Sequence, residues 1–112
     1  MDDLIKKHLQ DILTAIEEVE GFFGNAPKVY DDFYSNLCLR RAVESNIEII
    51  GEAMNRILKV DKDIAITNSR KIVDARNYII HGYDSLSVDI LWSMVINHLP
   101  KLRNEVITLL KT

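Results

Sequence analysis

Apolar residues recur along the chain at intervals of three and four, the spacing that places side chains on one face of an α-helix. The clearest stripe lies near the N-terminus and comprises Ile5, Leu9, Ile12, Ile16, Val19 and Phe23. Charged residues such as Lys6, Asp11 and Glu17 turn away from it. This pattern predicts a first helix. The glycines Gly21 and Gly24 and the Asn25-Ala26-Pro27 stretch should end it.

A second and longer helix is predicted to begin between Asp31 and Ser35 and to run to about Lys59, with Asp31 or Asp32 as its cap. Its apolar stripe comprises Val43, Ile47, Ile50, Met54 and Ile57. Three further residues, Ala42, Ile49 and Ala53, widen the apolar face beyond a single seam. We therefore expect this helix to lie centrally and to pack against several others.

Two more helical segments follow the polar stretch at residues 60–63. Thr67 or Asn68 can cap a third helix, whose predicted buried residues are Ile72, Val73, Ile79 and Ile80. Gly82 suits the left-handed position that ends such a helix. Ser85 or Ser87 can then cap a fourth helix.

The last apolar stripe continues through a proline. It comprises Val88, Trp92, Val95, Leu99, Leu102, Val106 and Leu109, with Pro100 in its middle. Either one helix kinks at Pro100 or a short break lets Pro100 open a fifth helix, with the same face buried in both cases. Because no segment has a strand pattern, the sequence predicts an all-α antiparallel bundle of four to five helices, forming a single domain over residues 1–112.

Composition narrows the environment and the partners. The 112 residues carry a formal net charge of −3, so the chain lacks the basic excess of broad nucleic-acid binders, and any RNA contact should come from a few local cations. The acidic N-terminus does not resemble a signal peptide, and no apolar run approaches the roughly 20 residues that span a bilayer. The single cysteine, Cys38, suits a reducing compartment. We expect a cytoplasmic protein without membrane insertion.

The most informative segment for function is Arg76-Asn77-Tyr78-Ile79-Ile80-His81-Gly82-Tyr83, at the predicted end of the third helix. At about 100° per residue, Arg76 and His81 lie roughly 140° apart around the helix, with Asn77 between them. A guanidinium can hold a phosphate while an imidazole moves the proton of an RNA 2′-hydroxyl. His8, His81 and His98 are widely separated without metal-ligand spacing, which disfavours a metal-dependent reaction and predicts no cofactor.

This segment resembles the signature of HEPN-superfamily proteins, specifically HepT-like toxins of toxin–antitoxin pairs. Arg41-Ala42-Val43-Glu44 with Ile49-Ile50-Gly51-Glu52-Ala53 is similar to that family's central helix, and Leu91-Trp92 with Leu99-Pro100 to its last. The resemblance implies a homodimer with a composite, metal-independent RNA-cleaving site. The site would use Arg76 and His81 as catalytic residues, with Asn77 in support. It also implies a minimal nucleotidyltransferase antitoxin that silences the toxin by transferring AMP to Tyr83.

The same residues also allow interpretations in which they have a purely structural role. Arg76 could form a surface ion pair with Asp74 or Asp84, and His81 could cap the C-terminal end of the helix. The row Arg40, Glu44, Glu48, Glu52 and Arg56 is best explained as a helix-surface charge ladder. His8 and His98 are predicted to be solvated, Cys38 to be at least half-buried and Trp92 to be core. The alternative function is a non-catalytic helical adaptor that binds a nucleotidyltransferase partner and a nucleotide.

Overall fold

The chain folds into helices joined by short connections. The computed structural model describes residues 1–81 and 84–112, and for residues 84–87 it describes the backbone alone. The elements are α1 (Asp3–Phe23), α2 (Tyr30–Ser35), α3 (Leu37–Val60), α4 (Ser69–Ile80), α5 (Asp84–Ser93), the π-helical turn η1 (Met94–His98) and α6 (Leu99–Leu110). Every element of the described residues is helical, which confirms the predicted all-α bundle.

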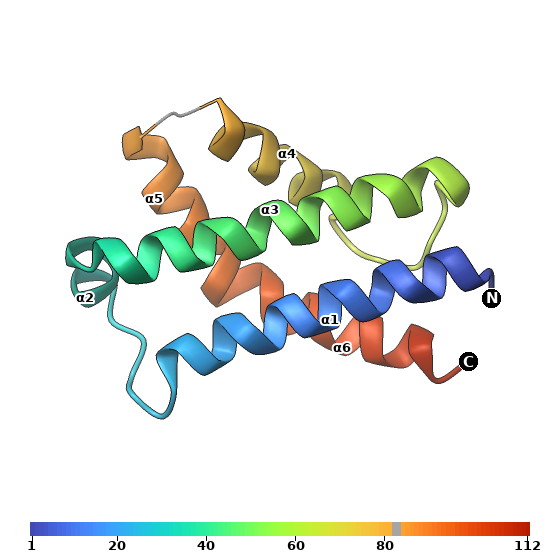
Figure 1. The fold of residues 1–112 in the computed structure, drawn as a ribbon, viewed down its shortest axis with the longest axis horizontal. Helices are drawn as coiled ribbons and strands as arrows, with labels where there is room; N and C mark the ends of the chain where they lie inside the picture. Colours follow the sequence, from blue (N-terminus) through green and yellow to red (C-terminus); the bar gives the residue numbers. More distant parts are fainter. Residues whose placement is uncertain (82–83) are drawn as a thin grey trace.

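Helix α3 runs through the middle of the molecule. α1 lies along one side of it and α4 along the other, both antiparallel to α3, while α6 packs against α1 (Figure 1). α5 leads from the end of α4 back into the bundle, and the two chain termini lie at the same end (Figure 1). α3 therefore has the central position that its wide apolar face predicts.

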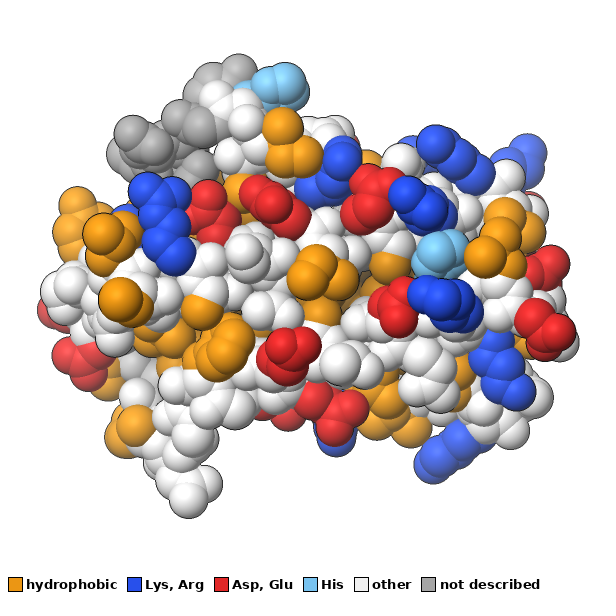
Figure 2. Space-filling model, in the orientation of Figure 1, with side chains coloured by type: hydrophobic (Ala, Val, Ile, Leu, Met, Phe, Trp, Pro, Cys, Tyr) orange, Lys and Arg blue, Asp and Glu red, His pale blue; other side chains and the backbone are white. Residues whose placement is uncertain are grey.

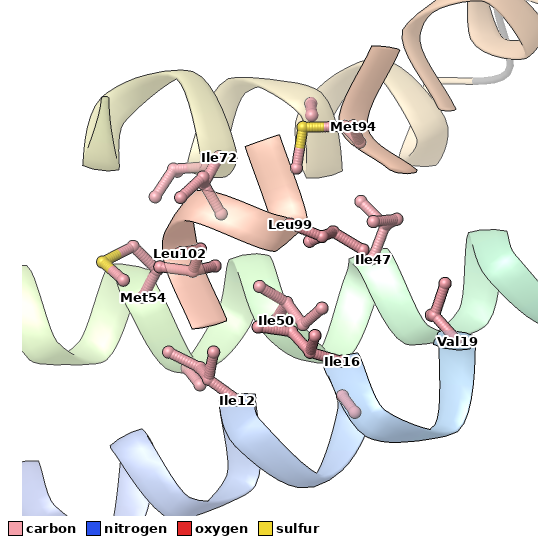
Figure 3. Packing of buried hydrophobic residues seen from close by; sticks show 14 of the residues in the cluster. Ile12, Ile16, Val19, Ile47, Ile50, Met54, Ile72, Met94, Leu99 and Leu102 are labelled. Atoms are coloured by element: carbon pink, nitrogen blue, oxygen red, sulfur yellow. The ribbon is translucent and has the colours of Figure 1, made fainter. Parts of the chain in front are cut away.

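The predicted apolar stripes form the core. Side chains from α1, α3, α4 and the C-terminal helices interlock in Figure 3, among them Ile12, Ile16, Ile47, Ile50, Met54, Ile72, Leu99 and Leu102. Two residues predicted to be inside are not: Ile49 is 51% exposed and Ile80 is 52% exposed. Ile49 faces a groove between α1, α3 and α4, and Ile80 lies at the last position of α4, lining the same groove.

The predicted single helix from Asp31–Ser35 to Lys59 is wrong at its beginning. A short helix, α2, ends at Ser35, and α3 begins afresh at Leu37 with extended backbone at Asn36 between them. The side chain of Asn36 caps α3 by accepting a hydrogen bond from the backbone N–H of Leu39 at 3.0 Å. Phe33 of α2 is fully buried, with its ring centroid 6.2 Å from that of Phe23 and 5.3 Å from that of Trp92. Burying this ring turns α2 away from the axis of α3.

Pro100 is accommodated by a π-helical turn immediately before it. The N–H of Leu99 bonds to the carbonyl of Met94, five residues earlier, and Pro100 falls in the first turn of α6, where no intrahelical donor is needed. The predicted tight break thus takes the form of η1. The same face stays buried through it at Val95, Leu99 and Leu102.

Two helix starts differ from the predicted caps. Asn68 precedes α4 as predicted, but it adopts a left-handed conformation, with φ 59° and ψ 27°, and its side chain makes no capping bond. Thr67 instead donates through its N–H and its hydroxyl to Glu105, which ties the start of α4 to α6. Ser85 and Ser87 are not caps, because α5 already begins at Asp84. Gly82, predicted as the left-handed residue, lies outside the described residues.

Three predictions about single residues fare differently. His8 was expected to be solvated and is buried, with 8% of its surface exposed, because it shares a helix face with the core residues Ile5 and Ile12. Cys38 was expected to be at least half-buried and is exposed, since the break at Asn36 places it in the outer first turn of α3. Trp92 is half-buried and packs against the core. Within the described ranges, no helix is long and apolar enough to cross a membrane.

Candidate active site

Arg76 is placed by a close approach of two helices. α4 packs against α3 where α3 carries Gly51, and a Cβ atom added to Gly51 would overlap Cβ of Arg76 and lie 3.1 Å from its Cγ. A side chain at position 51 would therefore push α4 away. Glycine at this position allows the stem of Arg76 to lie directly on the backbone of α3.

The guanidinium of Arg76 is oriented by Glu52, the next residue of α3. Its Nη2 lies 2.9 Å from Oε2 of Glu52, while Nε of Arg56 donates to Oε1 of the same carboxylate at 3.0 Å. The hydrogen bond from Arg56 and the positive charge of Arg76 lower the pKa of Glu52, and burial opposes them. Glu52 thus stays ionised between two arginines, and the Arg76 side chain is only 27% exposed. The ladder interpretation of Glu52 was incomplete, because its partner on α4 cannot be read from spacing within α3.

Arg76 and Glu52 lie in the wall of an open groove of about 650 Å³ between α1, α3 and α4. Lys7 and Asp11 of α1, themselves paired at 3.0 Å, form the opposite side. Figure 2 shows the face of the molecule on which α1, α3 and α4 lie, with cationic, anionic and hydrophobic side chains interspersed. This mixture fits the expectation that any RNA contact is local.

Asn77 and His81 line a different hollow, of about 380 Å³, together with Asp74 and Tyr78. His81 occupies the C-cap position of α4, and its backbone N–H bonds to the carbonyl of Asn77 at 3.1 Å. Both side chains belong to exposed residues. Arg76 and His81 therefore open on different sides of α4, as their separation around the helix predicts.

Asn77 connects the two sides. Its Oδ1 accepts a hydrogen bond from Nη1 of Arg76 at 3.2 Å, so the guanidinium is held by Glu52 on one side and by Asn77 on the other. The ion pair that Arg76 forms is with Glu52 across the α3–α4 contact rather than with the predicted Asp74, and the side chain of Asp84, the other predicted partner, lies outside the described part of the chain. Tyr83, the predicted AMP acceptor, lies outside the described residues. Among the residues that are described, no three His, Cys, Asp or Glu side chains form a group that could hold a metal ion.

Fold and site together define the class of the protein. It is an all-α helical bundle that presents an arginine, an asparagine and a histidine around the end of one helix. Within that class the family is clear: the chain belongs to the HepT-like ribonuclease family, whose model matches residues 12–109. The predicted family resemblance is confirmed.

Named relatives agree with this assignment. The chain is 34% identical over 104 residues to a protein of Methanocaldococcus jannaschii whose name describes it as a candidate RNase, covering 91% of this chain and 93% of the relative. It is 32% identical over 101 residues to a Thermococcus cleftensis protein named "Probable ribonuclease HepT", covering 89% and 90% of the two chains. No solved structure matches the chain.

Proposed function

We propose that this protein is a metal-independent endoribonuclease and the toxin of a toxin–antitoxin pair, with Arg76 and His81 as its catalytic residues. The observation that carries the proposal is the fixed guanidinium of Arg76, held by Glu52 and joined through Asn77 to the hollow that His81 lines. An oriented cation and an exposed imidazole that reach the same phosphate are the minimum equipment for phosphodiester cleavage. Membership of the HepT-like ribonuclease family supports the same reaction.

The proposed chemistry uses the substrate's own nucleophile. The imidazole of His81 accepts the proton of a ribose 2′-hydroxyl as that oxygen bonds to phosphorus, and water supplies a proton to the 5′-oxygen as its bond to phosphorus breaks. The guanidinium of Arg76 neutralises the negative charge that accumulates on the phosphoryl oxygens, and Asn77 keeps the guanidinium in place. The products are a 2′,3′-cyclic phosphate and a 5′-hydroxyl end.

A homodimer completes the site in this proposal. Because Arg76 and His81 of one chain line different hollows, a two-fold axis near the end of α4 would let the arginine of one chain and the histidine of its partner serve one phosphate. The dimer therefore accounts for the separation of the two residues on α4.

The regulatory part of the proposal concerns Tyr83. A minimal nucleotidyltransferase antitoxin would join the AMP phosphorus of ATP to the tyrosine oxygen and release pyrophosphate, leaving a bulky anion two residues from His81. That adduct would exclude the RNA phosphate. Intact-mass measurement after co-expression with the antitoxin should show the gain of one AMP unit, and the gain should be absent from Tyr83→Phe. An unchanged mass under active co-expression would reject this part alone.

The catalytic proposal is tested with purified protein and transfer RNA in EDTA. Wild type should release fragments with cyclic-phosphate ends, and Arg76→Ala and His81→Ala should each lower the rate by at least about a hundredfold, the usual effect of losing an acid–base or charge-stabilising group. Arg70→Ala is the matched control, because it removes an exposed α4 cation outside both hollows and should retain the activity. RNA that stays intact with wild type across salt and pH would overturn the proposal.

A second candidate function is the non-catalytic adaptor that binds a nucleotidyltransferase. The observation that favours it is the exposure of Ile49 and Ile80 beside the same groove, an apolar feature that a helical partner could cover. Expression in cells separates the two functions. If His81→Ala inhibits growth as strongly as wild type while Ile49→Asp does not, the adaptor is supported and the nuclease is rejected.

A further inference from the structure

A second hollow, lined by polar side chains and by the apolar residues Ala75, Ile90 and Met94, adjoins the one that His81 lines. It measures about 290 Å³ and lies between α4 and the α5–η1 segment, with Lys71, Asp74 and Tyr78 on one wall and Ser93 and His98 on the other. Asp74 and Tyr78 line both hollows, so the two are neighbours along α4. We call the two together the α4 trough.

The α4 trough follows from the helical positions of its residues. Lys71, Asp74, Tyr78 and His81 are separated by three, four and three residues, which places them on one face of α4. The opposite wall owes its shape to the π-helical turn η1, which ends at His98 immediately before α6. π-Helical turns occur often at functional positions. Here the turn places an imidazole in the wall opposite Lys71 and Tyr78.

The chemistry of the α4 trough changes along its length. Next to His81, the residue Tyr78 is 44% exposed, and an exposed aromatic side chain is a stacking surface for an unpaired base. At the far end, Lys71 is an exposed cation that takes part in none of the salt bridges found among the described residues. The carboxylate of Asp74 between them suits a hydrogen-bond donor, such as an amino group of a base or a ribose hydroxyl.

The protonation state of His98 also suits a hydrogen-bonding ligand in the α4 trough. Burial, and secondarily the charge of Lys71, lower the pKa of His98, so its imidazole is neutral at neutral pH. A neutral imidazole has one donor and one acceptor nitrogen and can pair with a base edge. With His98 neutral, Lys71 is the principal positive charge at this end of the α4 trough. A single positive charge favours the binding of one phosphate group there over a broad anion-binding surface.

We infer that the α4 trough binds the nucleotide next to the scissile phosphate, with its base on Tyr78 and the following phosphate at Lys71. The inference rests on the proposed ribonuclease function and adds the substrate subsite to it. Tyr78 lies three residues before His81, about 4.5 Å along the helix axis, which is close enough for a stacked base to adjoin the reacting phosphate. Lys71 lies about 10 Å further along the same face.

The test measures binding of a 2′-O-methylated RNA tetranucleotide, which keeps bases and phosphates but lacks the nucleophilic hydroxyl, to the intact protein. Loss of a base–aromatic stack or of a phosphate contact should raise the Kd about tenfold for Tyr78→Ala and for Lys71→Gln. Tyr78→Phe keeps the ring and should stay within about twofold of wild type. Lys101→Gln removes an exposed lysine on α6 outside the trough and is the matched control for charge.

Equal affinity of wild type, Tyr78→Ala and Lys71→Gln would overturn the inference, and so would a loss in Lys101→Gln as large as that in Lys71→Gln. Because both altered residues are exposed, the variants should fold, and circular dichroism checks this. The ligand cannot be cleaved, so the result does not depend on catalysis. Selective binding to a protein that leaves unmodified RNA intact would reject the nuclease and keep the subsite.

Discussion

At the scale of single residues, the candidate site is defined by how Arg76 is held. One carboxylate, Glu52, forms an ion pair with Arg76 and accepts a hydrogen bond from Arg56, and Asn77 accepts a hydrogen bond from the guanidinium of Arg76. Holding a long side chain in one position removes rotamer freedom before the substrate arrives, which favours catalysis through orientation. The same carboxylate would repel a phosphate bound at Arg76, so in the proposed site Glu52 should affect affinity and rate in opposite directions.

The substitution Glu52→Gln tests whether Glu52 affects affinity and rate in opposite directions. The substitution removes a negative charge beside the phosphate site, so KM for RNA should fall or stay level. The freed guanidinium should lower kcat by about tenfold or more, because misplacement of a catalytic group by about 1 Å can cost a hundredfold. Glu48→Gln is the control, since Glu48 lines the same groove but forms none of the salt bridges found among the described residues. A kcat equal to wild type in Glu52→Gln would show that Glu52 does not orient Arg76.

His98 should make stability depend on pH. Its pKa is lowered in the folded protein, first by burial and then by Lys71, so the unfolded chain binds a proton more readily than the folded one. The stability that the neutral imidazole contributes is therefore complete above the unfolded pKa of about 6.5 and is lost as pH falls towards the lower folded value. The melting temperature should drop between pH 7.5 and pH 5.5, and His98→Gln should reduce that drop. A drop in melting temperature of the same size in His98→Gln would show that other groups cause the pH dependence.

At the scale of elements, the position of α4 on α3 decides whether the site forms. Gly51→Ala should destabilise the fold by about 1–3 kcal/mol, because the added methyl overlaps the stem of Arg76. It should also lower cleavage, since α4 carries Arg76 and Asn77 and ends at His81. Gly21→Ala provides the matched control: nothing lies within 4 Å of its added Cβ, and alanine is the better helix former. Thermal melting of both variants measures the difference, and equal melting temperatures would contradict a tight α3–α4 contact.

The sequence predicts the long helices well because each has an unbroken apolar stripe; the stripe of α3 is buried as expected, and that of α1 is buried up to Val19, with Phe23 partly buried. It does not predict the separation of α2 from α3. That break depends on Phe33 packing against Phe23 and Trp92, which are distant in sequence. Equally, the contact between Glu52 and Arg76 depends on the packing of two helices at Gly51, so spacing within one helix could not reveal it.

At the scale of the whole molecule, the balance of charge limits how RNA can bind. A chain of net charge −3, with cations and anions interspersed on the face shown in Figure 2, offers few phosphate contacts in any one place. Each contact contributes a slope of about −0.7 to the dependence of log K on log salt for a single strand. Binding of the uncleavable tetranucleotide should therefore show a shallow slope, of magnitude about 2 or less, in a salt titration. A much steeper slope would indicate a broad cationic surface instead.

In the proposed homodimer, two chains together supply the arginine and the histidine for one phosphate. The most direct measurement mixes Arg76→Ala protein with His81→Ala protein and follows cleavage of transfer RNA in EDTA. Each variant alone should be inactive. The mixture should recover a substantial fraction of wild-type activity after subunit exchange, because a mixed dimer contains one site with an intact Arg76 from one chain and an intact His81 from the other. A mixture as inactive as its components, under conditions in which wild type cleaves and mass spectrometry detects mixed dimers, would contradict the composite site.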